Sequence, residues 1–540
     1  MKKNAIIFLI FFGLSFNLFA QFEDAWVYFT NKENVAASLA NPISILTQKA
    51  IDRKNNYGVT IDERDVPVNE AYITQIKNTS GVTVLAKSKW FNAVHVRGIQ
   101  SVIQGLESLS FVSAVDFANK NLNSKSTKVK NKPQKQPKLE GVFTTFNYGN
   151  SANQIKMING DKLHLTDSTG QGMLVAVLDA GFPNVNTMSS FKRLRDAGNI
   201  LGSYDFVNRS DDVYTGTTSN HGTLVLSTMA GYVENQFVGT APDASYYLFI
   251  TEDAPNENPV EESYWVEAVE RADSLGVDVV NTSLGYTTFD NTSYNYSPAD
   301  LNGYTAYITK GANVAFEKGL LLITSAGNSG NSGVGAPADS PNVLSVGAVN
   351  ASGNYASFSS VGSSFQPTQK PDVVAQGQAS YVITENDVIS TANGTSFSSP
   401  ILAGAIVCLW QSLPNKTNAE IMQIVRESAS QYNSPDYFLG YGIPNLELAL
   451  NNALSATSYN SDVLTVSLYP NPVKNKLYVK LPEQSDTISL ILYNVLGKEI
   501  NSYSISNENN FINIQTIPKG IYMVKLKHKS FSKTLKFIKQ

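Results

Sequence analysis

The sequence predicts an α/β protein: a parallel, doubly wound sheet, preceded by a small α+β unit and followed by a β-sandwich. Residues 142–455 alternate short apolar runs with helical patterns, which is typical of parallel sheets covered by helices on both faces. Residues 21–118 mix strand-like and helix-like segments over the length of a small domain. Residues 463–540 carry short β-rich runs separated by turn clusters such as Pro470-Asn471-Pro472, which favours a sandwich.

Composition places the chain among globular proteins with several domains. It has 540 residues, of which 42% are hydrophobic and 16% charged. A net charge of −4 over this length gives no support for nucleic acid or an anionic membrane surface as a partner. The single cysteine, Cys408, lies in an apolar helical run, and we expect it to be a small buried hydrophobe.

Residues 1–20 have the pattern of a secretory signal peptide. Lys2 and Lys3 precede an apolar core over residues 5–14, and Ala20 supplies a small residue near the cleavage point. The core is too short to span a membrane. We therefore expect a secreted protein.

Residues 21–118 form the predicted α+β unit, and residues 119–141 form a linker. The linker contains seven lysines between Lys120 and Glu140 and almost nothing apolar, so we expect a solvated tether. The segments predicted as strands are 26–30, 82–85, 92–97 and 111–116, and those predicted as helices are 43–53 and 102–109.

Three segments of the next region carry residues suited to acyl transfer. A buried apolar run over 173–179 ends in Asp179, so a parallel strand delivers this carboxylate to the carboxyl edge of the sheet. His221 stands before Gly222 at the start of a small-residue helix. Ser396 stands in a Gly-Thr-Ser turn before the apolar helix 401–410, where unpaired backbone N–H groups can meet an oxyanion. Taken singly, a strand-end cap, a helix-start residue and an N-cap are the alternatives.

These segments, in the order Asp, His, Ser, resemble the subtilases, the subtilisin-like serine peptidases. The Ile-Thr-Ser-Ala-Gly-Asn run ending at Asn328, the Ser283-Leu284-Gly285 segment and the Lys-Pro-Asp run at 370–372 resemble further family blocks. The resemblance covers residues 142–455. It implies a catalytic triad of Asp179, His221 and Ser396.

The resemblance also implies roles for other residues. Asn328 would donate to the oxyanion, and Ser283, Leu284 and Gly285 would form the strand that pairs with a bound peptide. Together with Ala326 and Gly327 they would border the first specificity pocket. Residues 21–118 would be a propeptide that inhibits the enzyme until it is cut away, with a retained N-terminal domain as the alternative.

No cofactor is required for this chemistry, and the sequence assigns no metal site. The acidic loop over 251–262 is a candidate for binding calcium or for favouring basic substrate residues, and a merely solvated loop is the alternative. Structural calcium is therefore left open.

The C-terminal region, 463–540, resembles the sorting domain of the type IX secretion system. The similar blocks are Tyr-Pro-Asn-Pro from Tyr469, Tyr-Asn-Val-Leu-Gly-Lys from Tyr493 and Lys-Gly-Ile-Tyr from Lys519. The resemblance implies export through the periplasm and outer membrane, with release or attachment at the cell surface. An adhesion or carbohydrate-binding module is the alternative.

The predicted function is a secreted serine endopeptidase that acts on proteins or peptides through an acyl-enzyme. The alternative is a catalytically silent protein of subtilase fold that binds peptides or serves in surface adhesion. We expect a monomer whose partners are its substrates, its own propeptide and the secretion machinery.

Overall fold

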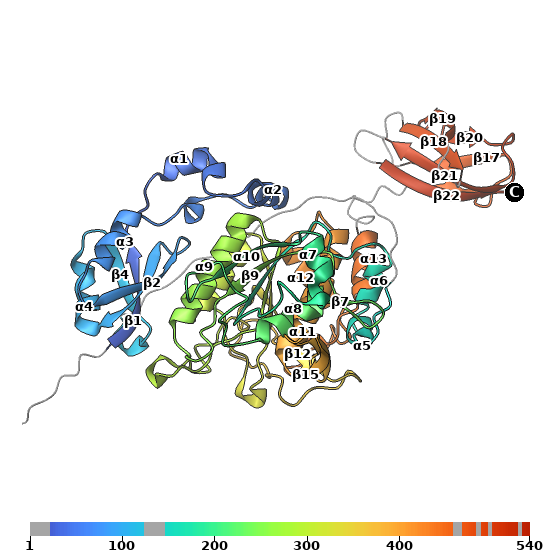
Figure 1. The fold of residues 1–540 in the computed structure, drawn as a ribbon. Coiled ribbons are helices and arrows are strands. Elements are labelled where there is room, and N and C mark those ends of the chain that lie inside the picture. The colour runs from blue at the N-terminus through green and yellow to red at the C-terminus, as the bar shows by residue number, and fades with distance from the viewer. Residues whose placement is uncertain (1–21, 124–145, 457–466, 482–487, 495–498, 528–531) are drawn as a thin grey trace, which may run out of the picture. The chain divides into compact units, whose positions relative to one another are not determined.

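The computed structural model describes residues 22–123, 146–456, 467–481, 488–494, 499–527 and 532–540 (Figure 1). The predicted signal peptide and most of the predicted linker lie outside these ranges. The chain forms two compact units, Met1–Asn451 and Asn452–Gln540, and each is described by itself. In the described segments, no helix combines the length and apolar character needed to cross a bilayer.

The chain first forms a four-stranded antiparallel sheet with the strand order β2-β3-β1-β4. Apolar side chains of its strands and helices share one core, which confirms the predicted α+β unit. Between the first strand and the third helix, the chain makes an excursion over residues 30–69 that holds two further helices. The elements are β1 (Phe22–Phe29), α1 (Val35–Ala40), α2 (Gln48–Tyr57), α3 (Glu70–Lys77), β2 (Val82–Ser88), β3 (Ala93–Ile99), α4 (Gln100–Gly105) and β4 (Val112–Phe117).

A seven-stranded sheet follows, with the order β13-β12-β11-β10-β5-β9-β6 and parallel pairing throughout. Most of its strands are continuous apolar runs because both of its faces are covered. The sheet strands are β5 (Leu174–Asp179), β6 (Ile200–Asp205), β9 (Ser245–Ile250), β10 (Val279–Thr282), β11 (Leu321–Ser325), β12 (Val343–Val349) and β13 (Val373–Gln376). Two hairpins lie beside it: β7 (Tyr232–Val233) with β8 (Phe237–Val238), and β14 (Ser380–Ile383) with β15 (Ile389–Ala392).

Helices cover both faces of this sheet, which confirms the doubly wound prediction (Figure 1). The helices are α5 (Ala152–Lys156), α6 (Gly160–His164), α7 (Lys192–Asp196), α8 (His221–Ala230), α9 (Val260–Leu275), α10 (Tyr307–Glu317), α11 (Thr395–Ser412), α12 (Asn418–Glu427) and α13 (Leu446–Ala456). Side chains of β5 alternate between the faces: Leu174, Ala176 and Leu178 pack in the core built with α9 and α10. Helix α11 packs against β10 to β13 and against α8.

The second unit contains two antiparallel sheets, with strand orders β16-β17-β20 and β19-β18-β21-β22. Residues of both sheets, including Leu477, Leu490 and Val524, share one apolar core, as expected for a sandwich. Its strands are β16 (Ser467–Tyr469), β17 (Lys476–Lys480), β18 (Ile488–Asn494), β19 (Glu499–Ile505), β20 (Phe511–Asn513), β21 (Gly520–Lys527) and β22 (Ser532–Lys539).

The packing of α11 leaves no room for a side chain at Gly404. A Cβ atom there would lie 2.1 Å from Thr240 Oγ1 and 3.2 Å from the backbone nitrogen of Ala241. Gly404→Ala should therefore destabilise the domain that contains the seven-stranded sheet by about 1–3 kcal/mol, measured as a lower midpoint of thermal unfolding.

Gly202→Ala on the edge strand β6 is the matched control, because its Cβ would make only ordinary contact with the Tyr247 ring at 3.4 Å. Equal unfolding midpoints for the two variants would contradict this account of α11 packing.

Candidate active site

Asp179 is the last residue of β5, and its carboxylate is buried. The strand lies between β10 and β9 and places the carboxylate at the carboxyl edge of the parallel sheet. Asp179 Oδ1 accepts hydrogen bonds from His221 Nδ1 and from the backbone N–H of Ala180, both at 2.8 Å. The sequence predicted this position for the carboxylate, and the structure joins it directly to His221.

His221 begins α8, so its ring stands at the end of the helix that faces β5. The helix comes this close because Gly222 has no side chain: a Cβ would lie 2.5 Å from the carbonyl oxygen of Gly181 and 3.0 Å from Asp179 Cβ. An ionised carboxylate only accepts, so Nδ1 carries the proton in this pair. Nε2 is then the nitrogen with a free lone pair.

Ser396 is the second residue of α11, after the turn at Gly394 (φ 149°, ψ 151°). The next residue, Phe397, has its ring centre 5.9 Å from that of His221, so the start of α11 lies beside the imidazole. In this conformation Ser396 Oγ donates to the carbonyl oxygen of Ser283 at 3.3 Å, and no described hydrogen bond joins it to His221. Such catalytic contacts are often completed only in the substrate complex.

Two candidate donors for an oxyanion lie near Ser396: the Asn328 side-chain amide and the backbone N–H of Ser396 itself. Asn328 Oδ1 accepts from the backbone N–H and the hydroxyl of Thr395, at 2.9 and 3.0 Å, which leaves its Nδ2 group free of that contact. The Phe397 N–H donates to the carbonyl of Gly394. The N–H of Ser396, between these two, has no partner in the described part of the chain, as the first turn of a helix allows.

The predicted substrate residues gather in one pocket of about 150 Å³. Ser283, Leu284, Gly285, Ala326 and Gly327 line it with Asn328 and Ser396. Strand β10 ends at Thr282, so residues 283–285 follow the strand instead of belonging to it. The predicted strand character is therefore not seen at residues 283–285.

Glu252 interacts electrostatically with both Asp179 and His221. From the sequence, Glu252 was identified only as part of an acidic loop. It follows β9 and accepts a hydrogen bond from Tyr286 at 2.8 Å. Burial, followed by the charge of Asp179, raises the pKa of Glu252 to about 7, against the lowering effects of Tyr286 and His221. Burial lowers the pKa of His221, but the charge and hydrogen bond of Asp179, with the charge of Glu252, outweigh it and raise the pKa overall.

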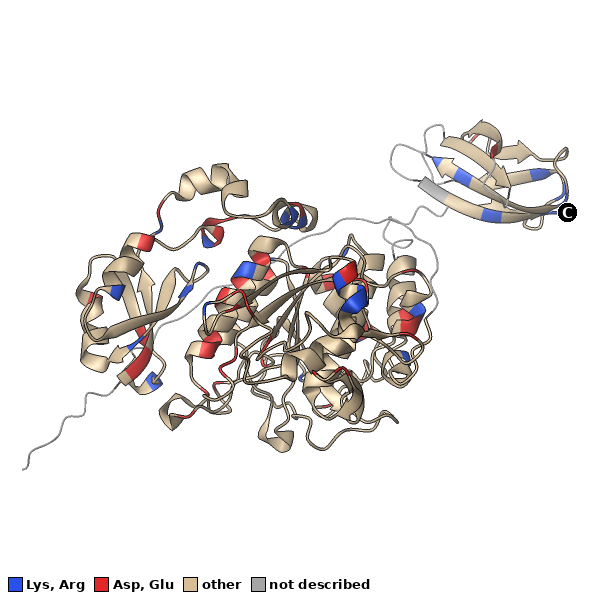
Figure 2. Cartoon of the chain, in the orientation of Figure 1, with Lys and Arg blue, Asp and Glu red and all other residues tan. Residues whose placement is uncertain are grey.

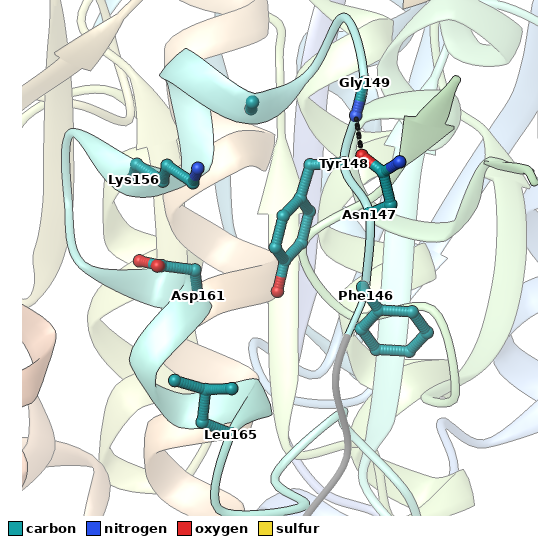
Figure 3. Close-up of a pocket in the computed structure, with 8 residues that line it drawn as sticks. Phe146, Asn147, Tyr148, Gly149, Lys156, Asp161 and Leu165 are labelled. Atoms are coloured by element: carbon teal, nitrogen blue, oxygen red, sulfur yellow. Dashed lines mark hydrogen bonds between the residues drawn. The ribbon is translucent and has the colours of Figure 1, made fainter. Parts of the chain in front are cut away.

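A second pocket, of about 300 Å³, lies elsewhere (Figure 3). It is lined by Phe146, Asn147, Tyr148, Gly149, Ala152, Lys156, Asp161 and Leu165, and contains none of the predicted site residues. Within the described residues, no group of three or more His, Cys, Asp or Glu side chains is arranged to hold a metal ion.

Comparison with known proteins fits this geometry. The family model described as "Subtilase family" matches residues 170–442, half of the chain. The chain belongs to the subtilase family. A model for the "Peptidase S8 propeptide domain, Bacteroidota" matches residues 24–136 of this subtilase, and one for the "Secretion system C-terminal sorting domain" matches residues 467–540.

Two subtilisins are among the similar proteins. Subtilisin NAT of Bacillus subtilis subsp. natto is 32% identical over 341 residues, 62% of this chain and 81% of its own. Subtilisin E of Bacillus subtilis (strain 168) is 31% identical over the same shares. The solved structure "Crystal structure of MycP1 with the N-terminal propeptide removed" aligns with 20% identity and a TM-score of 0.45, over 55% of this chain and 96% of that one. This subtilase is a subtilisin-like serine endopeptidase.

The raised pKa of His221 makes a prediction for the pH profile of kcat/KM. If His221 is the general base, activity should be lost as pH falls through its pKa, because a protonated imidazole cannot accept a proton. Removing a negative charge destabilises the imidazolium and lowers this pKa. Glu252→Gln should therefore move the acidic limb of the profile to lower pH.

Glu385→Gln is the control, because Glu385 accepts from the neighbouring Asn220 at 2.7 Å but is not among the groups that shift the pKa of His221. An acidic limb that stays in place in Glu252→Gln, or moves equally in both variants, would refute the influence of Glu252.

Proposed function

We propose that this subtilase is a secreted endopeptidase in which Asp179, His221 and Ser396 act as a catalytic triad through an acyl-enzyme. The observation that carries the proposal is the 2.8 Å bond between His221 Nδ1 and the buried Asp179 carboxylate, beside the helix start that holds Ser396. The bond orients the imidazole with Nε2 available as a base. The closeness of the Phe397 and His221 rings supports a nucleophile at the adjacent Ser396.

In the first half of the reaction, Ser396 Oγ bonds to the carbonyl carbon of the substrate and its proton passes to His221 Nε2. The C–N bond then breaks, and the same proton goes to the leaving amine. In the second half, water attacks the acyl carbon and His221 accepts its proton. The bond between that carbon and Ser396 Oγ then breaks, and the proton returns to Oγ. Asp179 stabilises the imidazolium in both halves.

The oxyanion that forms in each half would accept from Asn328 Nδ2 and from the N–H of Ser396. Asn328 suits this role because its Oδ1 is occupied by Thr395, which fixes the direction of the amide. The Ser396 N–H suits it because it lies at the start of α11 with no partner in the described residues.

Substrate would bind as an extended segment beside residues 283–285, with one side chain in the pocket that Gly285 and Gly327 border. Because glycine leaves this wall open, we expect a preference for large apolar or aromatic residues before the cleaved bond. A peptide library cleaved mainly after basic residues would overturn this preference.

The partners follow from the three matched parts of the chain. Residues 21–118 would act as the inhibitory propeptide, and the C-terminal part would pass the protein to the type IX secretion machinery for release or surface attachment. The route would cross the periplasm and the outer membrane. The chemistry needs only protein groups, while structural calcium and a monomeric state stay predictions.

The test is casein hydrolysis by the purified full chain beside Ser396→Ala, with mass spectrometry of both proteins. Cleavage of casein and loss of the N-terminal region by the parent alone would support the triad together with self-maturation. If the parent still fails to hydrolyse casein after an added protease has removed the N-terminal region, the catalytically silent alternative would be supported instead.

The oxyanion role of Asn328 predicts a defect in kcat more than in KM. Asn328→Ala should lower kcat by roughly 10²–10³. Asn328→Asp keeps an oxygen acceptor for Thr395 but loses the amide donor, so it should be similarly slow.

The exposed Asn331→Ala, three residues further along, is the control and should retain the parent kcat. Near-normal turnover by Asn328→Asp would remove the side-chain amide from the mechanism.

A further inference from the structure

The excursion between β1 and α3 contacts the peptidase domain separately from the N-terminal sheet. Thr47, the N-cap of α2, donates its N–H to the carbonyl of Ser274 at 2.9 Å. The first turn of α2 then lies against Gly276, where a Cβ atom would come within 2.7 Å of the backbone nitrogen of Ala50. Gly276 ends α9 in a left-handed conformation (φ 86°) that favours glycine, and its lack of a side chain lets α2 come this close.

This place is at the opposite edge of the sheet from the reacting groups. Gly276 lies shortly before β10, and Gly319, which the side chain of Val59 approaches, lies shortly before β11. Both are therefore at the amino edge of the parallel sheet. Asp179 ends β5 and Ser283 follows β10, so the active site is at the carboxyl edge.

Buried ion pairs join the two domains here. Asp273 of α9 binds the guanidinium of Arg53 and, at 2.8 Å, the Lys54 ammonium. Figure 2 shows the Lys and Arg residues of α2, the helix that carries Arg53 and Lys54, in blue. Lys318 of the peptidase domain binds Asp65 at 2.7 Å. These five side chains are at most 2% exposed. Each domain contributes both positive and negative side chains to these pairs. Because the side chains are buried, removing one charge leaves the opposite charge without compensation.

We propose that residues 47–66, the clamp, form a second binding element that keeps the cleaved propeptide on the peptidase domain from the amino edge of the sheet. The proposal rests on the proposed role of residues 21–118 as propeptide. Its partner is the surface around Asp273, Gly276 and Lys318. The clamp is an exosite contact: it holds the inhibitor without touching the reacting groups.

The clamp works beside a separate contact of the N-terminal sheet. Trp26 of β1 donates to Ser263 of α9 at 2.8 Å and stacks on Tyr307 of α10, with ring centres 4.4 Å apart. Two contacts made by one fragment strengthen its binding. When one contact opens, the other keeps the fragment close, so the open contact can form again. The charged faces of the clamp can also be solvated after separation, which suits a partner that must eventually leave.

The experiment uses the full chain with Ser396→Ala, so that self-cleavage plays no part. A recognition sequence for a site-specific protease replaces part of residues 124–141, and the chain is immobilised through a C-terminal tag. After the cut, loss of the N-terminal fragment is followed by biolayer interferometry. The parent should lose it slowly.

The double variant Arg53→Ala/Lys54→Ala should lose the fragment at least about 10-fold faster. Asp273→Asn should do the same with an unaltered propeptide, which excludes misfolding of the fragment as the cause. Lys77→Ala, an exposed lysine on α3, is the control and should match the parent.

If the clamp variants lose the fragment as slowly as the parent does, the proposed role of the clamp is overturned, but the role of the propeptide is not. Immediate loss of the fragment from the parent would overturn both the clamp and the propeptide's role as a bound inhibitor. The readout needs no catalysis, so an inactive enzyme would count against the proposed function and not against the clamp.

Discussion

The buried charge of Asp179 is the constraint on which the rest of the site depends. An ionised carboxylate inside a sheet is costly unless it is paired, and here one oxygen accepts from both His221 and the N–H of Ala180. The pairing requires α8 to start against the end of β5, which only a glycine at 222 permits. Helix α8 in turn packs on α11, the helix that carries Ser396. The burial of the Asp179 carboxylate is therefore linked, through α8, to the helix that positions Ser396.

Helix α9 serves two purposes whose physical requirements differ. One side covers the sheet with Trp265, Val269 and other apolar residues. Its other side carries carboxylates that meet the N-terminal domain: Glu270 accepts from the Ser88 hydroxyl and from the backbone N–H of Trp90. Burial raises the pKa of Glu270 to about 7 despite these bonds and the charge of Lys89. Such polar groups make the contact between the two domains directional, because each carboxylate needs donors at fixed positions.

The sequence predicted the parts of the fold that depend on local pattern. Continuous apolar runs identified β5, β9 and β12, and the small-residue helices after His221 and Ser396 marked α8 and α11. The position of Asp179 followed from the same runs, because the carboxyl ends of parallel strands meet at one edge.

Other features depend on contacts between distant segments and leave no periodic signal. Within the excursion over residues 30–69, the sequence predicted one helix, over 43–53. The structure has two, α1 and α2, and α2 lies where Arg53 and Lys54 can reach Asp273, about 220 residues away. The proximity of Glu252 to His221 depends on how the loop after β9 folds back on Tyr286. The hydrogen bond from Ser396 to Ser283 is likewise a matter of side-chain conformation.

The most direct test of the central claim is covalent labelling of the matured protein with a fluorophosphonate, read by intact mass and peptide mapping. The reagent forms a bond between phosphorus and a serine oxygen and releases fluoride only where a base activates that serine. The account predicts one adduct, on Ser396, that is lost in His221→Ala and greatly slowed in Asp179→Asn. Labelling of a different serine, or equal labelling of Ser396 without His221, would contradict it.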